Sequence, residues 1–292
     1  MQDQPFIHDA LLYSDDAQFV NETAAFLRAG LSNGESTLVA TDERKIGLLR
    51  EELGDTNGSV TYVNMHTAGR NPARIIQVWR DFLDDHPGAV RGIGEPVWDG
   101  RNSDELVECH IHEMLLNHAF AGRNNFSLLC PYEAPAFDDH VLHNVACTHG
   151  PDNKIENPFV GSLTEPPREA LSLDFDASSL QQVRRLCAEQ AERFGADAER
   201  AAEIVLAVHE VTSNSISYGD GKGSLSAWQK EDALVVEVRD QGQFTDPLAG
   251  RVFPEAIDDS GRGLWLANQL VDLLQIRCDD AGSTVRLTVR SH

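Results

Sequence analysis

Short apolar runs and amphipathic helical patterns alternate along the first half of the chain. Each of the runs ALLYS, STLVAT, VTYVNM, AVRGIGEPV and FSLLCPYE is followed by a segment whose apolar residues recur every three to four positions. Strict alternation of strand and helix predicts a mainly parallel sheet covered by helices on both faces. We therefore expect an N-terminal α/β domain of about five strands over residues 1–147.

A stretch without hydrophobic periodicity separates this half from the rest of the chain. Residues 148–169 are rich in Pro, Gly, Asn and charged side chains, which is typical of a linker. From residue 170 to residue 292 the pattern changes to one strand, two helices and then further strands, the last two joined around Gly282. Helices on one side of a mixed or antiparallel sheet predict an α/β sandwich as the second domain.

Composition and charge narrow the class of partner. The 292 residues include 24 Lys and Arg against 47 Asp and Glu, a net charge of −23. This charge repels nucleic acid and anionic membranes, so we expect a protein partner or a small ligand. No run approaches the roughly 20 apolar residues of a membrane span, and the acidic start MQDQPFIHD is unlike a signal peptide. These features predict a cytoplasmic protein that binds neither nucleic acid nor membranes directly.

The five cysteines are scattered and form no C-x-x-C pair. Their spacing argues against a disulfide framework and against a zinc module of the usual type. Reduced thiols are expected.

The helix predicted over residues 198–218 has two faces of different character. Its apolar stripe comprises Ile204, Val208 and Val211. On the other side Glu210 and Asn214 lie four residues apart, and therefore share a face on adjacent turns. A carboxylate can orient a hydroxyl and take its proton, and a carboxamide oxygen suits Mg²⁺, which needs few protein ligands. We expect this polar face to serve a ligand.

Three downstream features carry related chemistry. Asp240 ends a predicted strand, and Gly242 lets the backbone turn away behind it. Gly261 and Gly263 lie at the start of an amphipathic helix, whose free N–H groups and dipole favour an anion. Thr284 opens the last strand. Each feature alone is common in turns, caps and strands, but their order on these elements favours a nucleotide site.

In this order the segment over about residues 171–290 resembles the GHKL ATPase superfamily (gyrase, Hsp90, histidine kinase, MutL). Its short lid, between Asp246 and Ser260, resembles that of the bacterial anti-sigma factor serine kinases. The resemblance implies a GHKL-type α/β sandwich that acts as a protein serine/threonine kinase with ATP and Mg²⁺. The partners that it implies are an anti-anti-sigma (STAS-type) protein, a sigma factor, or both.

The same resemblance implies residue roles. Glu210 corresponds to the catalytic base and Asn214 to the Mg²⁺ ligand. The remaining cofactor-binding residues that it implies are Asp240 and Gly242 at the adenine, Gly261, Arg262 and Gly263 at the triphosphate, and Thr284 near the adenine.

Two features depart from the pattern of that family and keep alternatives open. The aspartate motif reads DQGQF without a second glycine, and Tyr218 stands where several relatives have a histidine or a lysine. A module that binds ATP and a sigma factor or other partner without transferring phosphate is therefore a second hypothesis. A histidine-kinase-like signalling protein is a third. The helix predicted over residues 180–194 has no histidine, and His209 points about 100° away from Glu210.

The first domain resembles the MEDS (methanogen/methylotroph sensory) domain over about residues 6–145, through IHDALLYSDD, GRNPARIIQVWRDF, ECHIHE and LLCPYE. The resemblance implies an input module that controls the kinase. Cys109, His112 and Glu113 share one helical face, and His8 in the first strand is able to approach it, so a sensory site is a hypothesis here. A buried His–Glu hydrogen bond is the commoner explanation. The sequence leaves a homodimer open.

Overall fold

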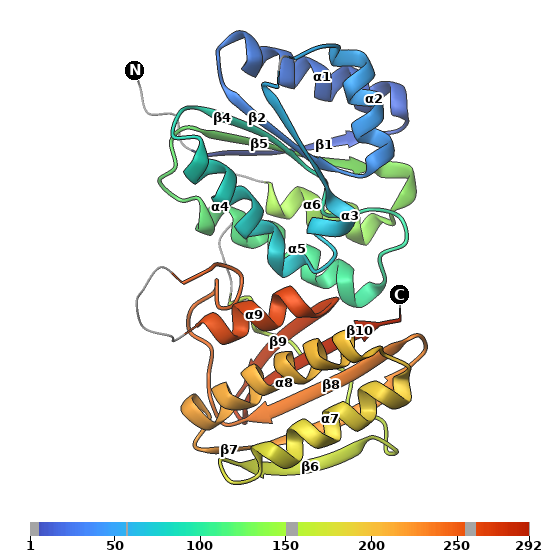
Figure 1. Cartoon of the computed structure of the whole chain (residues 1–292). Coiled ribbons are helices and arrows are strands. Elements are labelled where there is room, and N and C mark those ends of the chain that lie inside the picture. Colours follow the sequence, from blue (N-terminus) through green and yellow to red (C-terminus); the bar gives the residue numbers. More distant parts are fainter. Residues whose placement is uncertain (1–5, 57, 150–156, 255–260, 292) are drawn as a thin grey trace. The chain divides into compact units, whose positions relative to one another are not determined.

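The computed structural model describes residues 6–56, 58–149, 157–254 and 261–291. Two compact units, Met1–Ile155 and Glu156–His292, make up the chain, and the division falls inside the segment expected as a linker. Within the described residues each unit has a five-stranded sheet. The predicted fold classes, a parallel α/β unit followed by an α/β sandwich, are confirmed (Figure 1).

The sheet of the first unit is parallel throughout, in the order β1-β5-β4-β2-β3. Its strands are β1 (Ile7–Tyr13), β2 (Ser36–Thr41), β3 (Val60–Asn64), β4 (Val90–Gly94) and β5 (Phe126–Glu133). The strands β2 and β4 are neighbours in the sheet. The chain continues from β2 to β3, on the side of β2 away from β4, and from β4 to β5, on the side of β4 away from β2. The boundary between β2 and β4 is therefore the topological switch point, where open α/β sheets usually bind ligands.

Helices cover both faces of this sheet, as the alternating pattern predicts. They are α1 (Asp16–Ser32), α2 (Glu43–Leu53), α3 (Met65–Ala68), α4 (Ile75–Asp85), α5 (Ser103–Ala119) and α6 (Asp139–Thr148), with the short turns η1 (Pro72–Arg74) and η2 (Ala134–Ala136). Figure 1 shows α1 and α2 on one face and α4, α5 and α6 on the other. Trp79 of α4 is buried against Gly92 and Gly94 of β4, where an added Cβ would lie 2.6 and 2.9 Å from the indole ring. Glycines in β4 therefore allow the large ring to reach the sheet.

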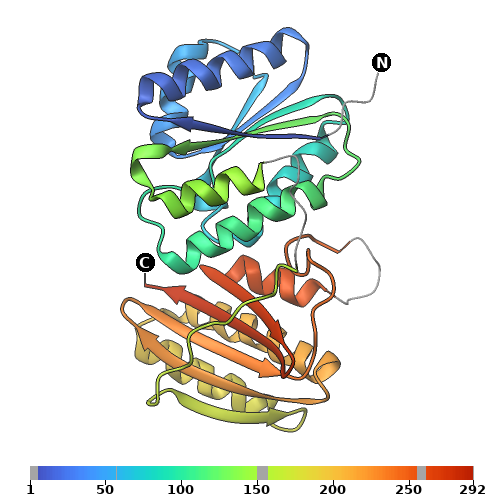
Figure 2. The same ribbon diagram turned by 180° about the vertical axis from the view of Figure 1, so that it is seen from behind.

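The second unit is an antiparallel sheet in the order β6-β7-β8-β10-β9 with helices on one face (Figure 2). Its elements are β6 (Leu171–Asp176), α7 (Leu180–Phe194), α8 (Ala198–Tyr218), β7 (Lys222–Lys230), β8 (Ala233–Asp240), α9 (Arg262–Leu270), β9 (Leu273–Asp279) and β10 (Gly282–Arg290). The predicted apolar stripe of α8 is buried in the core, together with inward-facing residues of β8 and β10. The polar stripe of α8 therefore faces away from this core.

The face of this sheet opposite the helices carries a polar network and a covering segment. The buried carboxylate of Glu237 accepts from Arg239 and Arg286. Arg239 also pairs with Glu165 at 2.9 Å, and Arg286 donates to the Thr164 carbonyl. Part of the segment expected as a linker thus packs along the second sheet.

Candidate functional site

The carboxylate of Asp240, at the carboxyl end of β8, is held by three donors. The Ser215 hydroxyl donates to Oδ2 at 2.5 Å, while the Gly242 N–H and the Ser283 hydroxyl donate to Oδ1 at 2.7 and 2.9 Å. A carboxylate offers about four acceptor positions, so about one remains for a donor on a ligand. Its half-buried environment leaves that position reachable.

Gly242 lies where the chain passes close to this carboxylate. A Cβ at this position would lie 2.9 Å from Asp240 Oδ1 and 2.9 Å from the Tyr218 carbonyl oxygen. The requirement for glycine therefore comes from close approach, which also leaves space beside Asp240.

On β10 it is Ser283, and not Thr284, that contacts Asp240. Thr284 pairs with Arg239 in the ladder. Since neighbouring residues in a strand point to opposite faces, Thr284 faces away from the Asp240 side. Sequence reasoning missed Ser283, although its position directly after Gly282 at the start of the strand was visible.

Glu210 and Asn214 lie one turn apart on α8, as predicted, and both are half-buried. Within the described residues neither side chain forms a hydrogen bond or an ion pair. A carboxylate and a carboxamide that are partly withdrawn from water usually find a partner. The side chains of Glu210 and Asn214 are therefore suited to bind a ligand.

The N-terminus of α9 lies beside Glu210. Gly261, with φ +98°, caps the helix in the left-handed region and, in the part of the chain that the structure describes, without a side-chain hydrogen bond. A Cβ on Gly263 would lie 2.4 Å from Glu210 Oε2, so the carboxylate touches the first turn. Arg262 is exposed, with its guanidinium 5.7 Å from the Phe253 ring. Of the predicted lid, residues 255–260 lie outside the described residues.

Together these groups fit a Mg²⁺–nucleotide. Asp240 retains an acceptor position for an amino group, and Asn214 offers a hard oxygen ligand. The first turn of α9, which has no side-chain cap within the described residues, offers N–H groups to phosphate oxygens. Glu210 lies against the same turn and is free to accept a proton. These observations come from three elements that the sheet and helix packing bring together.

In the first unit the structure joins two of the four residues predicted for a sensory site. His8 Nε2 lies 3.0 Å from Glu113 Oε2. The Cys109 thiol instead donates to the Pro96 carbonyl at 3.2 Å, outside this cluster. His112 is buried elsewhere on α5 and is not among the clustered groups.

Two residues that sequence reasoning did not include complete the cluster. Cys130 Sγ lies 3.3 Å from His8 Nε2, and His149 Nε2 lies 3.2 Å from Glu113 Oε2. Burial opposes ionisation of Glu113, yet His149 and His8 beside it hold its pKa well below the usual value. Burial also opposes a charge on His149, but the Glu113 carboxylate raises the pKa of this imidazole. The Glu113 carboxylate thus lies between two imidazoles, with a thiol beside one of them.

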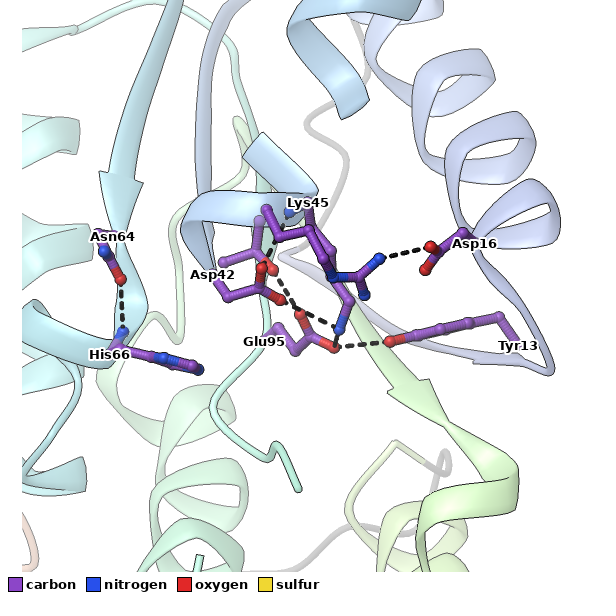
Figure 3. A network of polar contacts seen from close by, with 9 residues as sticks. Tyr13, Asp16, Asp42, Lys45, Asn64, His66 and Glu95 are labelled. Atoms are coloured by element: carbon purple, nitrogen blue, oxygen red, sulfur yellow. Dashed lines mark hydrogen bonds and ion pairs between the residues drawn. The ribbon is translucent and has the colours of Figure 1, made fainter. Parts of the chain in front are cut away.

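A separate polar cluster lies at the β2/β4 switch point (Figure 3). Lys45 Nζ lies 2.6 Å from Glu95 Oε1, and the Tyr13 hydroxyl donates to the same oxygen at 2.9 Å. Thr41 donates to Glu95 Oε2, and Lys45 Nζ also lies 3.4 Å from Asp42 Oδ2. Burial raises the pKa of Glu95 even though Lys45 opposes that shift. The side chains of this cluster form hydrogen bonds and ion pairs with one another, so the cluster ties α2 to the carboxyl ends of the strands.

Comparisons with known proteins divide the chain in the same way. Residues 7–150 match the family model of the MEDS domain (MEthanogen/methylotroph, DcmR Sensory domain), and residues 173–289 match that of the histidine kinase-like ATPase domain. No curated protein matches the chain. These matches confirm the two resemblances that the motifs predicted.

Among solved structures, the chain is similar to the crystal structure of the RsbU and RsbW domains of Rv1364c from Mycobacterium tuberculosis. The identity is 26%, the TM-score is 0.33, and the match covers 42% of this chain. The match covers 33% of that chain, so this chain spans about a third of its length.

Across the described residues, no helix combines the length and apolar character needed to cross a membrane.

Proposed function

We propose that this chain, in which a MEDS sensory domain precedes a histidine kinase-like ATPase domain, is a regulatory protein kinase. The kinase uses ATP and Mg²⁺ and phosphorylates a serine or threonine of an anti-anti-sigma (STAS-type) protein, and it also holds a sigma factor. The N-terminal unit controls this activity. One observation carries the proposal: Glu210 and Asn214, which have no partner among the described residues, lie on one face of α8, and Glu210 touches the first turn of α9.

The nucleotide would be held by groups from three elements. Asp240 would accept from the adenine amino group, with Ser215 and Ser283 fixing the orientation of the carboxylate. The first turn of α9, at Gly261, would bind phosphate oxygens through its N–H groups. Asn214 would contribute one oxygen to Mg²⁺. The bound nucleotide supplies an activated phosphoryl group, and the metal ion neutralises the charge that develops during transfer.

Glu210 would act on the acceptor. Its carboxylate orients the incoming hydroxyl and takes the proton that the hydroxyl loses, which contributes roughly 10²–10⁴-fold to such reactions. A serine or threonine of a partner suits this role better than a histidine of this chain. His209, the neighbouring imidazole on α8, is engaged by Arg184, whose Nη2 lies 2.6 Å from its Nε2.

The test has two stages, so that nucleotide binding and transfer are measured separately. Calorimetry first compares Mg²⁺–ATP binding by the full chain and by Asn214→Ala, which should lose the Mg²⁺-dependent part of the affinity. The chain is then immobilised with partners captured from a lysate of the source organism, and γ-labelled ATP is added. Acid-stable label on a captured protein supports a serine/threonine kinase. Binding of ATP without label favours the non-catalytic alternative, and acid-labile label favours a histidine kinase.

A further inference from the structure

We propose that the N-terminal unit binds one Zn²⁺ ion through His8, Glu113, Cys130 and His149. Their donor atoms all lie within 4.8 Å of one another. The ligands come from four elements: β1, α5, β5 and the cap of α6. This site is independent of the nucleotide site proposed in the second unit.

Three of the donor-atom pairs have spacings close to those of a tetrahedral shell. Bonds from zinc to nitrogen, oxygen and sulfur are about 2.0–2.3 Å long, which places ligand atoms about 3.3–3.8 Å apart in a tetrahedron. The three close pairs are 3.0 Å for His8 and Glu113, 3.2 Å for His149 and Glu113, and 3.3 Å for Cys130 and His8. The remaining pairs of donor atoms are up to 4.8 Å apart. Side-chain movements of up to about 1 Å would therefore bring all four atoms to the spacing of a tetrahedral shell.

The second nitrogen of His149 fixes which atom faces the cluster. Nδ1 lies 2.9 Å from the Val145 carbonyl oxygen, which can only accept, and 3.1 Å from the Thr148 hydroxyl. Because that hydroxyl can donate to the Val145 carbonyl instead, we assign the proton to Nδ1. In a neutral ring Nε2 then presents a lone pair to Glu113 Oε2, and two acceptors face each other at 3.2 Å. Either a proton on Nε2 or a metal cation between the two atoms removes this conflict, and zinc would take the place of that proton. A backbone carbonyl on the distal nitrogen is also the usual outer partner of a metal-bound histidine.

Some polar atoms of the cluster have no hydrogen-bond partner in the part of the chain that the structure describes. Among the described residues, His149 Nε2 and Glu113 Oε1 are buried and form no hydrogen bond. The side chains of His8 and Glu113 are only 2% and 3% exposed. Buried polar atoms of this kind are rare and call for a bound group.

Charge and donor type favour zinc. Two neutral imidazoles, one carboxylate and one thiolate balance Zn²⁺ completely, which lowers the cost of burying the ion. Binding releases the Cys130 thiol proton to solvent, because a coordinating thiol is deprotonated. Nitrogen and sulfur ligands disfavour Mg²⁺ and Ca²⁺, and four protein ligands are typical of a structural zinc site. The ion would tie α6 to α5 and to β1 and β5 at one edge of the sheet.

The experiment uses the full chain without a polyhistidine tag. Elemental analysis after dialysis should find about one zinc per chain. Cys130→Ser should weaken zinc binding by at least the roughly 10–100-fold that follows loss of an outer-shell partner. The matched control is Cys109→Ser, which alters another buried thiol of the same unit that bonds to Pro96 instead. This control should retain the metal.

Replacement of zinc by Co²⁺ gives a second readout that does not depend on how the variants fold. The wild-type chain should show the near-ultraviolet charge-transfer band of a cobalt–thiolate bond and the intense visible bands of a tetrahedral site. Wild-type protein that holds no stoichiometric zinc and shows no such bands after reconstitution would overturn the proposal. So would iron in place of zinc, or a Cys130→Ser chain that binds zinc as tightly as the wild type.

Discussion

Gly263→Ala should displace the Glu210 carboxylate without destabilising helix α9, so its effects on phosphoryl transfer and on stability can be measured separately. The new Cβ would lie 2.4 Å from Glu210 Oε2, whereas non-bonded heavy atoms need about 3.5 Å. The carboxylate must therefore withdraw by about 1 Å, which it can do because it is the end of a flexible side chain. A displacement of about 1 Å at a reacting group can cost about 10²-fold in rate.

The same substitution should not weaken the fold. Gly263 is a helical residue, and alanine is favoured over glycine in helices by about 0.5–1 kcal/mol. We expect the melting temperature to stay level or to rise while phosphoryl transfer falls about 100-fold. A variant that loses activity because it is destabilised would show a lower melting temperature, whereas displacement of the Glu210 base lowers only the transfer rate.

The assay measures initial rates of labelled phosphate transfer to the partner at saturating Mg²⁺–ATP, beside calorimetry and thermal melting of the same samples. Gly47→Ala in α2 is the matched control, because a Cβ there meets nothing within 4 Å. It should stabilise its helix without changing the rate. Transfer by Gly263→Ala at the wild-type rate would refute the role given to Glu210.

Three further predictions concern other parts of the chain. Asp240→Asn should weaken ATP binding by about 1–3 kcal/mol, because the amide has fewer acceptor positions than the carboxylate and its NH₂ must face a donor; unchanged calorimetric affinity would remove Asp240 from the site. Lys45→Met should lower the free energy of unfolding by about 3–5 kcal/mol in urea titrations, since among the described residues it leaves the buried Glu95 carboxylate with two hydroxyl donors but no positive partner, and adding Glu95→Gln should recover part of the loss. Burial raises the pKa of the Cys187 thiol to about 12, so at about pH 8 it stays protonated; native alkylation followed by mass spectrometry should modify the exposed Cys147 and spare Cys187 until urea is added.

The elements themselves could be predicted because each has a local signal. Alternation of apolar runs and helical periods predicted the parallel unit, and the stripe of Ile204, Val208 and Val211 predicted the buried face of α8. Glu210 and Asn214 share a face for the same reason, because helical spacing alone determines it.

Contacts between distant elements could not be predicted in this way. The strand order places β5, the last strand of the first sheet, directly beside β1. The pairing of β5 with β1 brings Cys130 next to His8, although the two residues are 122 positions apart in the sequence. Spacing on α5 favoured Cys109 as the thiol near Glu113, but the packing turns Cys109 toward Pro96.

Ser283 was missed for a different reason. The sequence shows that a strand begins after Gly282 but not which of its first residues faces the helices. The antiparallel register with β8 decides this, and it pairs Ser283 with Asp240. A shift of one residue would exchange the faces of Ser283 and Thr284.

Phosphate transfer by wild-type protein and by Glu210→Gln, measured side by side with the same captured partner, tests the central claim most directly. The account predicts acid-stable label on a serine or threonine with the wild type. With Glu210→Gln, ATP should still bind while the rate falls by roughly 10²–10⁴-fold. Equal rates for the two proteins, or no label from a wild-type chain that binds ATP, would contradict the kinase assignment.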